Sequence, residues 1–411
     1  MARVAVITAP NIGYRNTGML TVDLAFDSVR RRIGPGVEPT WYTLHTPETV
    51  PLRTDAAGTE LPFRFRSLIE HVDELADHDA VVFWGDFLHT RHYLAQDATN
   101  RLLDFGFAAD RAAARAILHR TLLLADQPDE LLARTLSYGG TILHNTQSDY
   151  SGCSGDDDKE FGPLFSRLVT RSHRMWLRDP VSAARVARLR GDRTTEHWGS
   201  DAALLNRPDD LARLPAGDWS REVPEGGAIG VFLGARTAVP EWLPGFCQEI
   251  SDRFGAPLEW LPWFDRAVPA GVAHIPARVP AGPAERTVGD LLHVLPRYRL
   301  VITDTYHLAV NAWGAGTPVV CVGAPEPVPT TDDDYLTLSE VKKHVFHMAY
   351  EAGDFYFSTV PDTPEYRRRR LDRLVRLVED GGAGAIAERV RGHADESETA
   401  FAGALKSLVG A

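Results

Sequence analysis

The chain has 411 residues, 44% of them hydrophobic and 24% charged, with a formal net charge of −12. A chain of this length is too long to fold around one small hydrophobic core, so we expect two domains. The acidic balance argues against a non-specific nucleic-acid binder, which needs a basic surface, and no apolar run approaches the roughly 18–20 residues of a membrane span.

The cysteines and the N-terminus favour a cytoplasmic protein. Cys153, Cys247 and Cys321 lie far apart without the spacing of metal ligands, which suits a reducing compartment and predicts no metal site. Residues 1–10 are too short and too soon polar for a signal peptide, and they predict a first β-strand instead.

The first half of the chain alternates between predicted strands and helices. Residues 3–8 form an apolar strand, and a polar turn leads from it into a helix from about Leu20 to Arg32. Residues 80–84 are a second clear strand, and residues 175–177 are a strand end followed by a capped helix. Weaker strand candidates are 121–125, for which a helix is the alternative, and 141–144. The alternation predicts an α/β sheet.

The second half repeats this alternation after a linker. Residues 208–227 are rich in proline, glycine and charge, and a new strand begins at Ala228. Later strands are expected at 258–261, 300–302 and 319–322, and the last ~45 residues are helical with a break at the glycines 381–384. We therefore predict two Rossmann-like domains facing a cleft. Their expected ranges are 1–220 and 221–385, with a C-terminal helix at 386–411.

The segment from Tyr298 to Gly323 carries the strongest functional signal. A buried strand at 300–302 is followed by the polar turn Thr303-Asp304-Thr305 and by a helix that contains His307 in its first turn. Sheets of this type bind ligands at the carboxyl ends of their strands, where a helix N-terminus and an imidazole meet a phosphate together. We predict that His307 is a general acid or base. Asp304 either orients its ring or caps the helix.

Three arginines follow predicted strands and are candidates for holding an anionic substrate. Arg15 lies in the first loop, Arg178 follows the strand at 175–177, and Arg236 lies in the turn that begins at Gly234. A guanidinium binds phosphate or carboxylate with two parallel hydrogen bonds, although each arginine alone is also explained as a surface residue.

The first loop contains Gly13, Asn16 and Gly18, which suit close approach of the backbone to a ligand. Their spacing differs from a dinucleotide-binding fingerprint, and a purely structural turn is an equal alternative. The runs Asp156–Asp158 and Asp332–Asp334 are interpreted as solvated loops, and Arg367–Arg370 as a solvated helix face.

Taken in order, these motifs resemble those of the polysaccharide pyruvyl transferase-like proteins. The matching stretches are Gly13-Tyr-Arg-Asn16-Thr-Gly18, Gly162-Pro163, Arg178-Asp-Pro-Val-Ser182, Asp201-Ala-Ala-Leu-Leu, Thr303-Asp-Thr-Tyr-His307 and Gly316-Thr-Pro318. The similarity extends over roughly residues 1–325.

This resemblance implies a GT-B-type fold and transfer of the enolpyruvyl part of phosphoenolpyruvate to sugar hydroxyls. His307 would then be the general acid or base, and nearby arginines would hold the donor. The sequence departs from the family pattern at Thr305, where the family has arginine, and at Met19, where it has aspartate. Losing one charge-assisted contact costs about 1.5–3 kcal/mol, so either another arginine substitutes or the donor has changed.

Three functions therefore remain open at the level of the sequence. The first is pyruvyl transfer to a sugar or glycosylated small molecule, and the second is glycosyl transfer from a nucleotide-diphosphate sugar. The third is a non-catalytic binding protein that kept the fold. For either transferase we expect no cofactor or metal, donor contacts from Gly234, Arg236, Thr303 and Thr305, and substrate or phosphate contacts from Gly13, Arg15, Asn16, Gly18 and Arg178. A homo-oligomer is compatible with the sequence.

Overall fold

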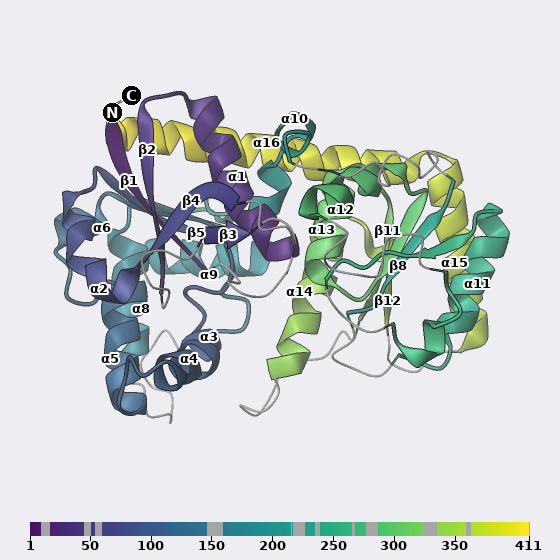
Figure 1. The fold of residues 1–411 in the computed structure, drawn as a ribbon, viewed down its shortest axis with the longest axis horizontal. Coiled ribbons are helices and arrows are strands. Elements are labelled where there is room, and N and C mark those ends of the chain that lie inside the picture. The colour runs from purple at the N-terminus through teal and green to yellow at the C-terminus, as the bar shows by residue number, and fades with distance from the viewer. Residues whose placement is uncertain are drawn as a thin grey trace.

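The computed structural model consists of two α/β domains that lie side by side, with one long helix running along both (Figure 1). This confirms the predicted architecture of two Rossmann-like domains with a helical C-terminal segment. The structure describes residues 1–9, 17–44, 51–53, 60–145, 159–214, 216, 227–234, 239–264, 268–276, 287–323, 335–358 and 363–410.

The first domain is built on a seven-stranded sheet in the order β3-β4-β2-β1-β5-β6-β7. All neighbouring pairs are parallel except β3 and β4. The strands are β1 (Ala2–Thr8), β2 (Val37–Thr43), β3 (Pro51–Arg53), β4 (Glu60–Ser67), β5 (Ala80–Trp84), β6 (Thr135–Gly140) and β7 (Arg174–Leu177). The central strands are apolar on both faces because helices cover both sides of the sheet.

Side chains of β1 alternate between two cores. Val4 and Val6 belong to one core, and Ala5 and Ile7 to the other. The first core contains side chains of α1 (Thr17–Ile33), and the second contains side chains of α4 (Thr99–Asp104), α5 (Arg111–Leu122), α8 (Phe161–Arg171) and α9 (Pro180–Arg190). Short helices complete the domain: α2 (Leu68–His71), α3 (Arg91–Tyr93), α6 (Asp129–Leu132) and α10 (Pro208–Leu211).

The second domain has a five-stranded, fully parallel sheet in the order β12-β11-β10-β8-β9. Its strands are β8 (Ile229–Phe232), β9 (Leu258–Trp260), β10 (Leu300–Thr303), β11 (Val319–Gly323) and β12 (Tyr356–Ser358). Its helices are α11 (Leu243–Phe254), α12 (Val288–Val294), α13 (Tyr306–Gly314), α14 (Tyr335–Ala349) and α15 (Pro364–Glu379).

The helix α16 (Gly382–Val409) ties the two domains together. It starts after Gly381, whose φ of +81° ends α15 with a turn that favours glycine. Its Phe401 is fully buried against Trp84 and Tyr138 of the first sheet, with ring centroids 5.3 and 5.2 Å apart. One apolar core therefore runs from the first sheet through α16 into the second domain.

Neither of the two weaker strand candidates of the first domain is a strand, and the helical alternative for the first of them is correct for its first two residues. Residues 121–122 end α5, the rest of 121–125 is loop, and residues 141–144 are a loop that follows β6. The true strand, Thr135–Gly140, ends in two glycines and has weak β propensity, so only its burial in the centre of the sheet selects it. None of the described helices is long and apolar enough to cross a lipid bilayer.

Candidate functional site

Arg178 is fixed at the carboxyl end of the first sheet by the start of α9. The strand β7 ends at Leu177, and Asp179 caps the helix by accepting a hydrogen bond from Ser182 N at 2.7 Å. Pro180 occupies the first turn, where its fixed φ favours helix initiation. The backbone N of Arg178 donates to Gly140 O at 2.9 Å, so its side chain leaves the sheet at the edge where ligands bind.

The Arg178 side chain joins the two domains. It is only 4% exposed, and its Nη1 lies 3.2 Å from Asp201 Oδ2. The same carboxylate oxygen accepts a hydrogen bond of 3.1 Å from the hydroxyl of Tyr306, the first residue of α13 in the second domain. The guanidinium also contacts two rings, 5.2 Å from the centroid of Phe87 and 4.8 Å from that of Tyr306.

Lys342 of α14 adds a second cation to the same pair of rings. Its amine lies 4.8 Å from the centroid of Phe87 and 5.1 Å from that of Tyr306. We call Phe87, Arg178, Asp201, Tyr306, His307 and Lys342 the interdomain cluster. The guanidinium of Arg178 and the amine of Lys342 therefore both lie beside the rings of Phe87 and Tyr306, and two neighbouring positive charges attract an anion.

His307 lies in the first turn of α13, against the start of α1. It is 9% exposed, and its Nε2 is buried without a hydrogen-bond partner among the described residues. A Cβ added at Gly18 would lie 2.2 Å from His307 Cβ, so the two helices approach as closely as they do only because position 18 is glycine. Nearby, Asn311 Nδ2 donates to Thr21 Oγ1 at 3.1 Å and ties the same two helices.

The electrostatics of the cluster keep its imidazole neutral. Burial lowers the pKa of His307 to about 3, and the neighbouring Lys342 and Arg178 act in the same direction while Asp201 opposes them. Burial likewise lowers the pKa of His144 to about 3, again with help from Lys342 and Arg178. Arg178 Nη2 is buried with no hydrogen-bond partner in the described part of the chain. A bound ligand would supply hydrogen-bond partners for His307 Nε2 and Arg178 Nη2.

Two aspartates of the first domain, Asp86 and Asp23, lie near the interdomain cluster. Burial raises the pKa of Asp86, an effect that Arg178 and Lys342 oppose, and its φ of +51° is unusual for a residue other than glycine. Burial raises the pKa of Asp23 to about 8, opposed by Thr8 and reinforced by Asp86. Asp23 therefore carries a proton at neutral pH, and its buried Oδ2 has no hydrogen-bond partner among the described residues.

The residues predicted to bind the donor meet at the ends of β8 and β10. Asp304 Oδ1 accepts hydrogen bonds from Gly234 N at 2.6 Å and from Thr305 Oγ1 at 3.1 Å. The Thr303 hydroxyl accepts one from Thr305 N at 3.0 Å. No hydrogen bond joins Asp304 to His307 in the described chain, so Asp201 is the carboxylate that acts on that ring. A donor-binding role for this group stays a prediction.

Several predicted site residues lie outside the described residues: Gly13, Arg15, Asn16 and Arg236, as well as the aspartate runs 156–158 and 332–334. Within the described residues, no three or more His, Cys, Asp or Glu side chains gather as a metal site would require.

Sequence reasoning assigned no role to Tyr306, Lys342, His144 or Asp23. Lys342 belongs to α14, for which no helix was predicted, and only the tertiary fold brings it to Phe87. The sequence does indicate Asp23, because it is an acidic residue among the apolar residues on the buried side of α1. An aspartate in that setting is a candidate for a perturbed pKa.

Comparison with known proteins establishes the fold and no family. Neither a protein-family model nor a curated protein matches the sequence, so the resemblance to pyruvyl transferase-like proteins has no support from family models. A UDP-GlcNAc 2-epimerase from Neisseria meningitidis, bound to UDP-GlcNAc, is similar in structure with a TM-score of 0.52 and 8% identity, over 98% of this chain and 100% of that one.

A second similar structure is LpCGTa in complex with UDP. Its TM-score is 0.51 at 13% identity, and the similarity covers 100% of both chains. At such low identity these likenesses establish the fold alone. The fold is of the GT-B type, which this chain shares with enzymes that use nucleotide sugars.

Proposed function

We propose that this protein is a transferase that moves a sugar from a nucleotide-diphosphate donor to a hydroxyl-bearing acceptor at the interdomain cluster. The observation that carries the proposal is the buried Arg178, which lies beside Lys342 and the neutral His307 at the junction of the two domains. Its Nη2 has no hydrogen-bond partner among the residues that the structure describes. The structural neighbours that hold UDP or UDP-GlcNAc support the choice of donor.

The cations of the cluster suit a departing diphosphate. As the bond between the sugar C1 and the diphosphate oxygen breaks, negative charge grows on that oxygen. Arg178 and Lys342 stabilise this charge, and the N-terminus of α13 adds its dipole. A site built this way needs no metal ion to release the leaving group.

His307 is the base of the proposed reaction. Its neutral ring accepts the proton of the acceptor hydroxyl while that oxygen forms its bond to C1. Asp201 favours the imidazolium that results, and the bound diphosphate raises the pKa of His307 from its low value in the empty protein. We infer that the second domain holds most of the donor, through Gly234, Thr303 and Thr305. The first domain holds the acceptor and reaches the diphosphate of the donor through Arg178.

Pyruvyl transfer from phosphoenolpyruvate is the second candidate. The fold brings Arg178, Asp201 and His307 together, and all three belong to the motifs that resemble pyruvyl transferase-like proteins. In that reaction two acceptor hydroxyls bond to C2 of the donor, its CH2 gains a proton and becomes a methyl group, and phosphate leaves. Thr305 in place of the family arginine makes this the weaker candidate.

Ligand-induced thermal stabilisation decides between the donors. A ligand at 100 times its Kd stabilises the protein by about 2.7 kcal/mol. We expect a rise in Tm with at least one of the UDP-, GDP-, ADP- and dTDP-sugars, and loss of that rise in Arg178→Met. A shift with phosphoenolpyruvate alone would establish the second candidate. No shift with any donor would refute both and leave a binding protein without this chemistry.

A further inference from the structure

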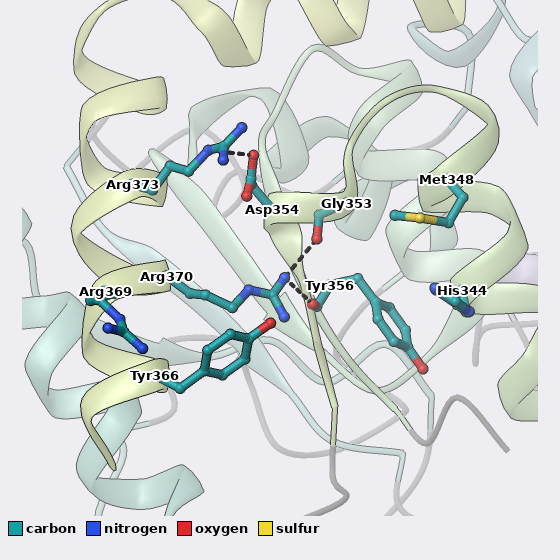
Figure 2. A pocket seen from close by; sticks show the side chains of 9 residues that line it. All are labelled: His344, Met348, Gly353, Asp354, Tyr356, Tyr366, Arg369, Arg370 and Arg373. Atoms are coloured by element: carbon teal, nitrogen blue, oxygen red, sulfur yellow. Dashed lines mark hydrogen bonds and ion pairs between the residues drawn. The ribbon is translucent and has the colours of Figure 1, made fainter. Parts of the chain in front are cut away.

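A pocket lies on the second domain, between α14, α15 and the edge strand β12 (Figure 2). Its volume is about 580 Å³, within the range of small-molecule sites. His344 lines it from α14, two residues after Lys342 of the interdomain cluster. Residues i and i+2 of a helix point to different sides, so the pocket is separate from that cluster.

One wall of the pocket is cationic. Arg369, Arg370 and Arg373 of α15 line it together with a single carboxylate, that of Asp354. Arg373 Nε lies 2.8 Å from Asp354 Oδ2, whereas no ion pair links Arg369 to another residue in the described part of the chain. Three guanidinium groups against one carboxylate leave a local excess of positive charge in a protein whose net charge is −12.

Arg370 is held rigidly within this wall. Its Nη2 donates to Gly353 O at 2.7 Å and to Tyr356 O at 2.6 Å, and its guanidinium lies 4.7 Å from the centroid of Phe357. Figure 2 shows it reaching across from α15 to these carbonyl groups. It therefore fixes the pocket floor, while the exposed Arg369 is the arginine that can bind a ligand.

The remaining lining is aromatic and apolar. The rings of His344 and Tyr356 lie 5.0 Å apart at an angle of 30°, and burial lowers the pKa of His344, which keeps its ring neutral. Tyr366 and Met348 are 46% and 47% exposed, two of the few large hydrophobic side chains open to solvent among the described residues. Flat or apolar groups pack well against such side chains.

We propose that this pocket binds a small anion that combines a phosphate group with a flat ring. Arg369 binds the phosphate oxygens with charge-assisted hydrogen bonds, and the neighbouring guanidinium groups of Arg370 and Arg373 add positive charge. The His344, Tyr356 and Tyr366 rings and the Met348 thioether contact the ring of the ligand. The site is independent of the proposed transfer reaction, since none of its lining residues belongs to the interdomain cluster.

The proposal is tested by calorimetry with phenyl phosphate on the full chain. Arg369→Ala should weaken binding about tenfold or more. The matched control is Arg376→Ala, because Arg376 is exposed on the same helix and does not line the pocket. Lys342→Ala removes a cation of the interdomain cluster and should also leave the affinity unchanged. Phenol should bind more weakly than phenyl phosphate.

Three results would overturn the proposal. The first is absence of phenyl phosphate binding at millimolar concentration. The second is binding that Arg369→Ala leaves intact or that Lys342→Ala abolishes. The third is Arg369-dependent binding to vesicles of anionic lipid without any binding of phenyl phosphate, which would make the arginines a membrane contact.

Discussion

Replacing Gly18 by alanine should separate α1 from α13 and disable the interdomain cluster. The added Cβ would lie 2.2, 2.8 and 3.1 Å from Cβ, Cγ and Nδ1 of His307, against about 3.5–4.0 Å for ordinary contact, so one helix must move by more than 1 Å. Overpacking of this kind costs about 1–3 kcal/mol, partly offset by the 0.5–1 kcal/mol that alanine gains over glycine in a helix. We expect a net loss of about 1–2 kcal/mol in urea unfolding, and roughly 100-fold lower transfer activity.

The control is Gly392→Ala in α16, where an added Cβ meets nothing within 4 Å. That variant should gain about 0.5–1 kcal/mol. His307→Ala keeps the Cβ that makes the shortest contact, so Gly18→Ala should stay destabilising in that background. In a His307→Gly background, which lacks this Cβ, Gly18→Ala should no longer be destabilising. If Gly18→Ala unfolds at the same urea concentration as Gly392→Ala, the close approach of the two helices does not exist.

Three further substitutions test other parts of the structure. Burial raises the pKa of Asp23 to about 8, from 3.8 for an ordinary aspartate. The stability that its proton confers is therefore present below about pH 4 and is lost progressively as pH rises to about 8. Asp23→Asn should raise Tm by several degrees at pH 9 and change little at pH 4, and an equal effect at both pH values would contradict the burial of a carboxyl. Arg178→Met should destabilise the protein by about 3–5 kcal/mol, because it leaves the charge of Asp201 buried without its partner. Adding Asp201→Asn should restore the free energy of unfolding, but a thermal-shift assay should still show no donor binding. Phe401→Ala should cost about 3–5 kcal/mol in denaturant unfolding, and a cost below 1 kcal/mol would mean that α16 is not packed on the first sheet.

The parts of the fold that the sequence predicts well are those in which burial and local propensity agree. The strands β1, β5, β10 and β11 are short apolar runs that a sheet buries on both faces. The strands β6 and β12 have no such run, and their neighbours in the sheet select them. Propensity alone therefore missed strands whose stability comes from tertiary contacts.

The residues of the candidate site also divide into those that local sequence patterns predict and those that only tertiary contacts bring to the site. Arg178, Gly18 and His307 were predicted from their places at strand ends and helix starts, and the fold does bring these elements to one junction. Asp304 was expected either to orient the ring of His307 or to cap α13. The N-cap residue of α13 is Thr305, and the Asp304 side chain hydrogen-bonds to Gly234 in a neighbouring loop. Lys342 reaches Phe87 across the domain junction, and a contact between residues so far apart in the chain follows from no local pattern.

The position of Phe401 has a consequence for the order in which this protein folds as it is made. Trp84 and Tyr138 of the first sheet pack against a side chain of α16, a helix that follows all strands of both sheets in the chain, and Tyr138 also hydrogen-bonds to Ser397 at 2.7 Å. The ribosome makes α16 after the strands of both sheets, so the first domain waits for this helix with part of its core exposed. Chains truncated before α16 should therefore aggregate or depend on chaperones, although both sheets would already have been synthesised.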